Sequence, residues 1–175
     1  MLAFDIETEG LNPVVHHITC ACAFDPEAGI KQTFIFSRGD SPEEFMALLD
    51  GASQLCTFNG VRFDVPFIAK QWQVPMQRVG AWMLKLVDVY EAARLCAGRG
   101  FSLNALLLQN QLPTKTGSGL EAIDMAHSGR WEELAEYCMH DTQMTYEVTC
   151  RDVIWLPLGD SPRGQAMARN PLRFT

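Results

Sequence analysis

The chain has 175 residues, 47% of them hydrophobic, and a formal net charge of −7. This length suits one globular domain with a sizeable core and excludes a second full domain. No apolar run reaches the roughly 18 residues of a membrane-spanning helix, and the acidic balance argues against a general nucleic-acid coat protein. An enzyme that handles nucleic acid through bound metal ions remains open, because those cations would offset its acids.

The six cysteines lie mostly within apolar segments and follow no disulfide-scaffold spacing. The first residues also lack the basic segment of a signal peptide. We therefore expect an intracellular protein with buried, reduced thiols. A zinc site built from His16, His17, Cys20 and Cys22 is disfavoured, because side chains along a strand alternate between faces and no second ligand pair of zinc spacing follows.

The first third of the chain is typical of β-strands. Three segments are rich in Val, Ile, Phe, Ala and Thr, and the turn signature DPEAG separates the last two. The pattern predicts a three-stranded antiparallel meander formed by Met1–Ile6, His16–Phe24 and Ile30–Ser37.

Helices and short strands then alternate. Ser41 caps a helix that opens with Pro and two Glu, and the buried strand QLCTF follows it. The dipeptide NG ends that strand before a helix over Arg62–Gln71, and LKLVDVY reads as a short extended segment leading into another helix. Ser102 caps the helix FSLNALLLQNQL, and two more helices are expected over Glu121–Ser128 and Trp131–Arg151.

These elements predict an α/β fold with a mixed sheet of five to six strands, three antiparallel strands followed by parallel additions, flanked by helices. We expect residues 1–152 to form the domain. Residues 153–175 contain three prolines and net positive charge, so we expect an extended tail there, and whether it binds a protein partner stays open.

Three separated segments carry acids in positions that suit chemistry. Asp5 and Glu7 share one face of the first strand, since strand residues i and i+2 point the same way. Asp64 lies in the first turn of the helix after the NG turn, and Tyr137 and Asp141 lie four residues apart on one helical face. Each segment alone has an ordinary explanation: a solvated strand end, a helix dipole, or chance. Together, four carboxylates of this kind can hold two divalent ions that clamp a phosphoryl displacement.

The segments FDIETEGL, FNGVRFD and YCMHD resemble the three motifs of the DEDD exonucleases of the ribonuclease H-like superfamily. The third motif resembles the branch with tyrosine, called DEDDy, because Glu136 stands where the sister branch has histidine. The second motif is similar to bacterial and phage exonucleases related to the proofreading domain of family B DNA polymerases. The resemblance runs from about Met1 to Arg151.

This resemblance implies a ribonuclease H-like fold and a metal-dependent 3′→5′ exonuclease that releases nucleoside 5′-monophosphates from a single-stranded 3′ end, DNA being favoured over RNA. Two Mg²⁺ or Mn²⁺ ions would be the cofactors. Tyr137 would orient the attacking water or the phosphate, since a phenol of pKa near 10 is a poor base at neutral pH. The implied metal ligands are Asp5, Glu7, Asp64 and Asp141, and the implied substrate contacts are Thr8, Leu11 and Asn59.

Three further polar residues lie outside this set of motif residues. Lys115, in the Gly-rich segment TKTGSG, is a candidate phosphate contact. Asp88 is either a further site residue or a helix cap, and His140 is expected at the rim of the site. Two alternatives remain: a proofreading-like or nucleic-acid-binding module that acts only within a larger assembly, and a ribonuclease H-type endonuclease.

Overall fold

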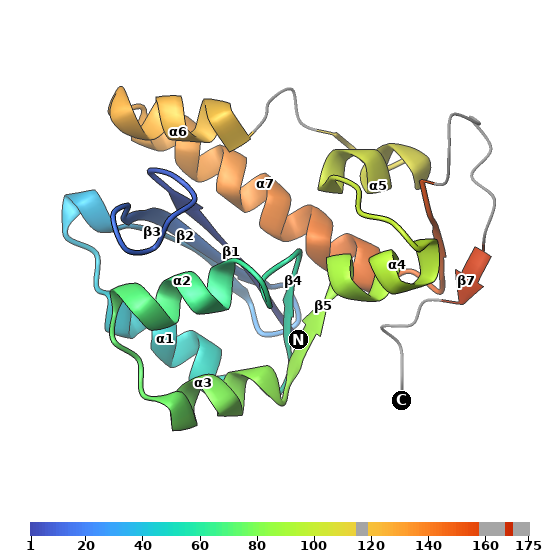
Figure 1. The fold of residues 1–175 in the computed structure, drawn as a ribbon, viewed down its shortest axis with the longest axis horizontal. Helices are drawn as coiled ribbons and strands as arrows, with labels where there is room; N and C mark the ends of the chain where they lie inside the picture. Colours follow the sequence, from blue (N-terminus) through green and yellow to red (C-terminus); the bar gives the residue numbers. More distant parts are fainter. Residues whose placement is uncertain (115–118, 158–166, 170–175) are drawn as a thin grey trace.

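A mixed five-stranded sheet forms the centre of the molecule (Figure 1). The computed structural model describes residues 1–114, 119–157 and 167–169. The first three strands pair antiparallel, and the other two add in parallel beside β1, so the predicted meander with parallel additions is confirmed. In sheet order the strands are β3 (Ile30–Ile35), β2 (Ile18–Asp25), β1 (Leu2–Thr8), β4 (Leu55–Thr57) and β5 (Leu86–Asp88).

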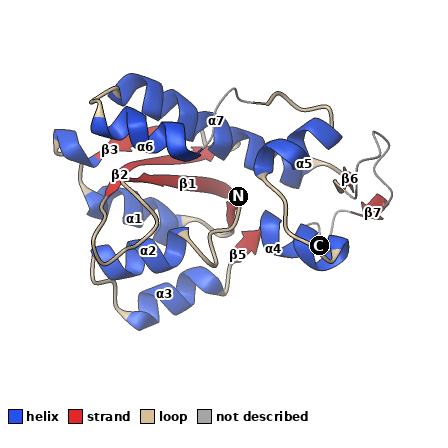
Figure 2. Cartoon of the chain, turned by 45° about the horizontal axis from the view of Figure 1, so that its top comes forward, coloured by secondary structure: helices blue, strands red, loops and turns tan. Residues whose placement is uncertain are grey.

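Helices cover both faces of this sheet (Figure 2). Alternate side chains of β1 divide between the faces, so Leu2, Phe4 and Ile6 join the core beneath one helical layer. Asp5 and Glu7 point to the opposite face, where the long helix α7 crosses the sheet. The first layer contains α1 (Pro42–Gly51), α2 (Asp64–Gln71) and α3 (Met76–Met83), and the second contains α6 (Gly119–His127) and α7 (Trp131–Cys150).

Serine caps start two of the helices where the sequence predicts them. The Ser41 hydroxyl accepts a hydrogen bond from the amide of Glu44 at 3.3 Å, and Ser102 accepts one from Ala105 at 3.2 Å. Such caps each contribute about 1 kcal/mol of stability. Ser102 begins α5 (Leu103–Gln109), which follows α4 (Val89–Ala97). None of the helices in the described ranges is long and apolar enough to cross a membrane.

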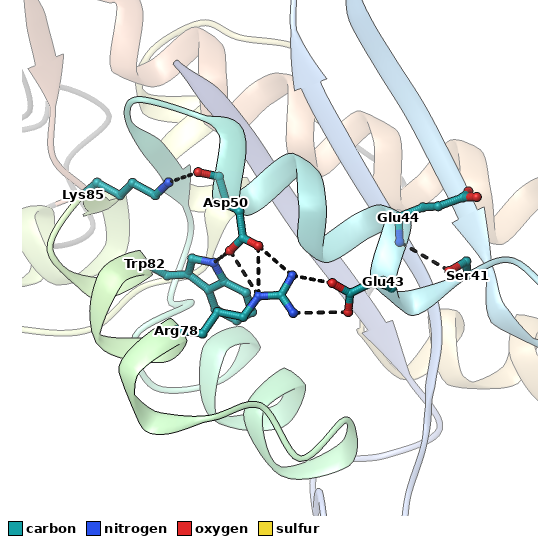
Figure 3. A network of polar contacts seen from close by, with 7 residues as sticks. All are labelled: Ser41, Glu43, Glu44, Asp50, Arg78, Trp82 and Lys85. Carbon is teal, nitrogen blue, oxygen red and sulfur yellow. Dashed lines mark hydrogen bonds and ion pairs between the residues drawn. The ribbon is translucent and has the colours of Figure 1, made fainter.

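A polar network joins α1 to α3, a helix that the sequence pattern did not predict (Figure 3). The Arg78 guanidinium donates two parallel hydrogen bonds to Glu43, at 2.9 and 3.1 Å, and also donates to Asp50 at 2.6 Å. The buried indole of Trp82 donates to the same Asp50 carboxylate at 2.7 Å. Lys85 closes the junction by donating to two backbone carbonyls at the end of α1. This network fixes the helical layer beneath β1.

The described residues after position 152 do not simply extend away from the domain. A short strand β6 (Val153–Trp155) pairs antiparallel with β7 (Met167–Arg169). Ile154 and Leu156 are each only 1% exposed and join the core around α4, α5 and the end of α7. The side chain of Asn110 bonds both backbone groups of Trp155, at 2.8 Å each. The chain thus packs against the domain beyond the boundary expected at residue 152.

Candidate active site

A cleft of about 500 Å³ lies between β1, the loop after β4, and α7. Its walls come from segments that are far apart in the chain, because the parallel strand β4 places the start of α2 beside β1 while α7 crosses the other side. The cleft brings together all five residues that the sequence singled out for catalysis: Asp5, Glu7, Asp64, Tyr137 and Asp141.

Asp5 and Glu7 line the cleft from β1. They pair across the sheet with Cys22 and Cys20, and a carboxylate oxygen of each lies within 4.8 Å of one of the other. Two like charges at this separation repel each other unless a cation or a proton intervenes. The pair therefore favours binding of a cation at this end of β1.

Asp64 is tied to β1 from the opposite wall. Its side chain is only 2% exposed, and its Oδ1 accepts a hydrogen bond from the backbone amide of Ile6 at 3.2 Å. Burial raises the pKa of this carboxyl to about 7, against the lowering effect of the backbone hydrogen bonds and with a further increase from the charge of Asp88. The bond to Ile6 orients the Asp64 carboxylate toward the strand residues that flank Ile6.

The turn between β4 and α2 depends on Asp88. Asn59 adopts a left-handed backbone conformation (φ 69°), and a Cβ at Gly60 would lie 2.3 Å from Cγ2 of Thr57, which explains the dipeptide NG. The Asp88 carboxylate accepts hydrogen bonds from the amides of Asn59 and Val61, both at 2.9 Å, and also caps α4. Asp88 is thus a structural residue behind the cleft, as the capping interpretation predicted.

Tyr137 and Asp141 lie on the face of α7 that covers the sheet. Tyr137 is 9% exposed, and both side chains line the cleft. His140 instead lines a separate depression beside β3, although its Nδ1 lies 3.5 Å from Oδ1 of Asp141. The histidine expected at the rim is therefore outside the cleft lining and touches it only through its neighbour.

Sequence reasoning missed one thiol in contact with the site. Cys138 follows Tyr137 on α7, and its Sγ lies 3.6 Å from the backbone oxygen of Asp5 and 3.9 Å from the carboxylate Oδ2. Burial raises the pKa of this thiol well above its ordinary value, so it remains a neutral donor toward Asp5. The motif YCMHD includes Cys138, but the contact of this residue with Asp5 depends on how α7 packs on the sheet.

The predicted substrate contacts divide between two neighbouring hollows. Asn59 lines the acidic cleft, whereas Thr8 and Leu11 line an adjoining pocket of about 340 Å³ that is mostly apolar. The Thr8 hydroxyl already donates to the carbonyl of Gly10 at 2.8 Å, and Leu11 is 79% exposed. Lys115, the candidate phosphate contact, lies outside the described residues.

The donor set of the cleft suits hard divalent cations. Carboxylate oxygens are the ligands that Mg²⁺ and Mn²⁺ prefer, and four carboxylate side chains line the site. In the described part of the chain, the cleft lining includes neither Lys nor Arg. The site can thus bind cations and, through them, a phosphate.

An acidic cleft above the central strand of a mixed sheet defines an α/β protein suited to cation-assisted chemistry. The sequence model of the ribonuclease H (RNase_H) superfamily matches residues 2–117, more than half of the chain. The chain therefore belongs to the ribonuclease H superfamily, and its sheet agrees with that fold.

This membership indicates a nuclease-type activity on nucleic acid, of a kind that generally uses divalent metal ions. The match includes Asp5, Glu7 and Asp64 but ends before Tyr137 and Asp141. A comparison with curated proteins gave no match.

Proposed function

We propose that the protein is a two-metal-ion 3′→5′ exonuclease that releases nucleoside 5′-monophosphates from single-stranded nucleic acid, with DNA favoured over RNA. The observation that carries this proposal is the convergence of four acids and one tyrosine, from β1, α2 and α7, on one cleft. These five residues match the three motifs by which the chain resembles DEDDy exonucleases. The superfamily match supports the nuclease class, while the tyrosine on α7 supports this particular branch.

Asp5, Glu7, Asp64 and Asp141 would hold the metal ions. When bound, such ions neutralise developing charge on a phosphate and lower the pKa of water. The chain's own contribution is to fix the ligands: the amide of Ile6 orients Asp64, and the strand fixes the spacing of Asp5 and Glu7. Tyr137 would act by positioning, with its phenol held in the cleft wall by α7.

The pocket beside the cleft would receive the terminal nucleotide. It shares Glu7, Phe63 and Gly119 with the acidic cleft, so a strand could enter both hollows at once. Leu11 and Leu120, which line this pocket, are 79% and 78% exposed, and an apolar base face would cover them. Because the described cleft lining lacks basic side chains, strand binding by the cleft would be weak and would rely on the bound metal ions.

The test is a time course with a 5′-labelled single strand in Mg²⁺ or Mn²⁺. An exonuclease working from the 3′ end shortens the strand in single-nucleotide steps, and a label at the 3′-terminal phosphodiester appears as mononucleotide. Addition of EDTA should stop both. Running DNA and RNA strands of the same sequence in parallel tests the expected preference for DNA.

A circular single strand of the same composition separates the alternatives. An exonuclease leaves the circle intact, whereas a ribonuclease H-type endonuclease cuts it. If neither the linear nor the circular strand is cleaved at protein concentrations where the strand is bound, the result would contradict catalysis by the isolated chain. It would support a module that acts only within an assembly.

A further inference from the structure

A second group of metal-ligating side chains lies behind the acidic cleft. Cys20 and Cys22 point from β2 toward α7, where they meet Cys138, and the three Sγ atoms lie within 4.8 Å of one another. All three residues are fully buried, with 0% exposure. The proposed cleavage uses none of these thiols as ligands, so their convergence calls for a separate explanation.

The spacing of the sulfurs is close to that of a thiolate metal site. Metal–sulfur bonds of about 2.3 Å in a tetrahedron separate the sulfurs by about 3.8 Å, so capture of an ion needs only a small contraction. The hydroxyl of Thr33 lies 3.3 Å from Sγ of Cys22, where it can donate a hydrogen bond to a thiolate. Sulfur ligands favour Zn²⁺ and similar soft ions over Mg²⁺.

The thiols are also connected to the cleft. Cys138 belongs to a second group of closely spaced ligands, in which its Sγ and carboxylate oxygens of Asp5 and Glu7 all lie within 4.8 Å. Asp5 also lines the cleft, so the Cys138 thiol lies in contact with a carboxylate of the cleft wall. An oxygen of Asp5 lies 3.9 Å from Sγ of Cys138, so the thiol group borders the acidic cleft at this residue.

We propose that Cys20, Cys22 and Cys138 form a binding site for a thiophilic divalent ion of the Zn²⁺ type, which borders the Asp5 carboxylate through Cys138. Each thiol that coordinates releases its proton, and no oxidant or reductant is needed. Because Cys138 contacts Asp5, which belongs to the proposed nuclease site, an ion held by the thiols would disturb that carboxylate and inhibit cleavage; this consequence alone rests on the proposed function.

The test is titration of the reduced, metal-free protein with Co²⁺ under anaerobic conditions. Thiolate ligation gives sulfur-to-cobalt charge-transfer absorption, which carboxylate ligation in the cleft cannot give. We expect the band to saturate at one equivalent, to disappear on addition of Zn²⁺, and to weaken at least about tenfold in Cys20→Ala and Cys22→Ala. Cys56→Ala, which removes a buried thiol outside the group, and Cys96→Ser, which removes an exposed one, should keep the full band.

X-ray absorption at the zinc edge of the loaded wild-type protein gives a second measurement that needs no variant. Sulfur neighbours support the site, and a shell of oxygen and nitrogen alone overturns it. Absence of the cobalt band in the wild-type protein also overturns the site. An undiminished band in both Cys20→Ala and Cys22→Ala does the same. Asp5→Asn should abolish nuclease activity yet keep the band, so failure of the proposed function and failure of this site give different results.

Discussion

Two groups of carboxylates in the described part of the chain are compensated in different ways. At the junction of α1 and α3, Glu43 and Asp50 share the guanidinium of Arg78 (Figure 3). In the cleft beside β1, four acids line one hollow whose described walls contain no basic side chain. The same chemical group thus serves for packing where the chain supplies the cation and, under the proposed function, for binding a cation from solution.

The pKa values of carboxyls in the two regions shift in opposite directions. Partial burial raises the pKa of the Asp50 carboxyl, but hydrogen bonds from Arg78 and Trp82 outweigh it and bring the pKa below its ordinary value. Burial raises the pKa of Asp64 in the cleft to about 7. The junction therefore contains its own compensating cation, while a bound ion at the cleft belongs to the proposed function.

The largest expected effect is loss of activity on removing a cleft acid. Glu7→Gln should reduce nuclease activity at least about 1,000-fold, equivalent to roughly 4 kcal/mol, because a neutral amide replaces a proposed metal ligand. Single-turnover cleavage of a labelled strand measures this. Glu9→Gln is the matched control, since Glu9 lies two residues further on and accepts a hydrogen bond from His17. Equal losses in both variants would contradict the site.

A smaller kinetic effect is expected on α7. Tyr137→Phe should reduce the cleavage rate about 10- to 100-fold with little change in strand binding, because only the positioning hydroxyl is lost. His140→Ala should stay within about threefold of wild type, since His140 lies outside the cleft lining. Rates and binding constants measured separately test this order, and the reverse order would exclude the tyrosine-dependent assignment.

The cleft should also change how stability depends on pH in the metal-free protein. Asp64 has a raised pKa when folded, so the folded state holds more protons than the unfolded state between about pH 4 and 7. Its contribution to stability is present at low pH and is lost as pH rises through that range. Asp64→Asn should remove this decline in urea unfolding with EDTA. An unchanged slope would contradict the burial argument.

The smallest effect is expected at the α1–α3 junction. Arg78→Ala should lower the free energy of unfolding by about 1–2 kcal/mol, because its partners Glu43 and Asp50 are substantially exposed and screened by solvent. The lowered pKa of Asp50 means that this stabilisation is present above about pH 4 and is lost as pH falls further. Denaturant unfolding at pH 7 and pH 3 tests both statements. Nuclease activity of the folded variant should match wild type.

Local signals in the sequence predicted most of the elements. Ser41 and Ser102 marked helix starts correctly, and LKLVDVY became β5 followed by α4, with Asp88 as the cap. The sequence pattern did not predict the helix α3, because Gly80 lies within it and Pro75 precedes it, and both residue types usually signal turns. The sequence pattern also did not predict the pairing of β6 with β7, because a segment that contains proline separates these two strands in the sequence.

Strand alternation and helical spacing also predicted the faces on which the acids lie. They did not predict which residues contact those acids. The bond from Ile6 to Asp64 and the contact of Cys138 with Asp5 depend on how helices sit on the sheet. The antiparallel register that sets Cys20 beside Glu7 and Cys22 beside Asp5 is likewise a tertiary property. A single sequence carries no local signal for such contacts, because they join residues far apart in the chain.

The hydrogen bonds of Asp88 have a consequence for protein engineering. The turn over residues 58–61 is held by a carboxylate that comes from another strand, so the two segments form one transferable unit. A designer who grafts this turn onto a different sheet must move β5 and the cap of α4 with it, or the amides of Asn59 and Val61 will lose their acceptor. The smallest portable part of the cleft wall is therefore discontinuous in sequence.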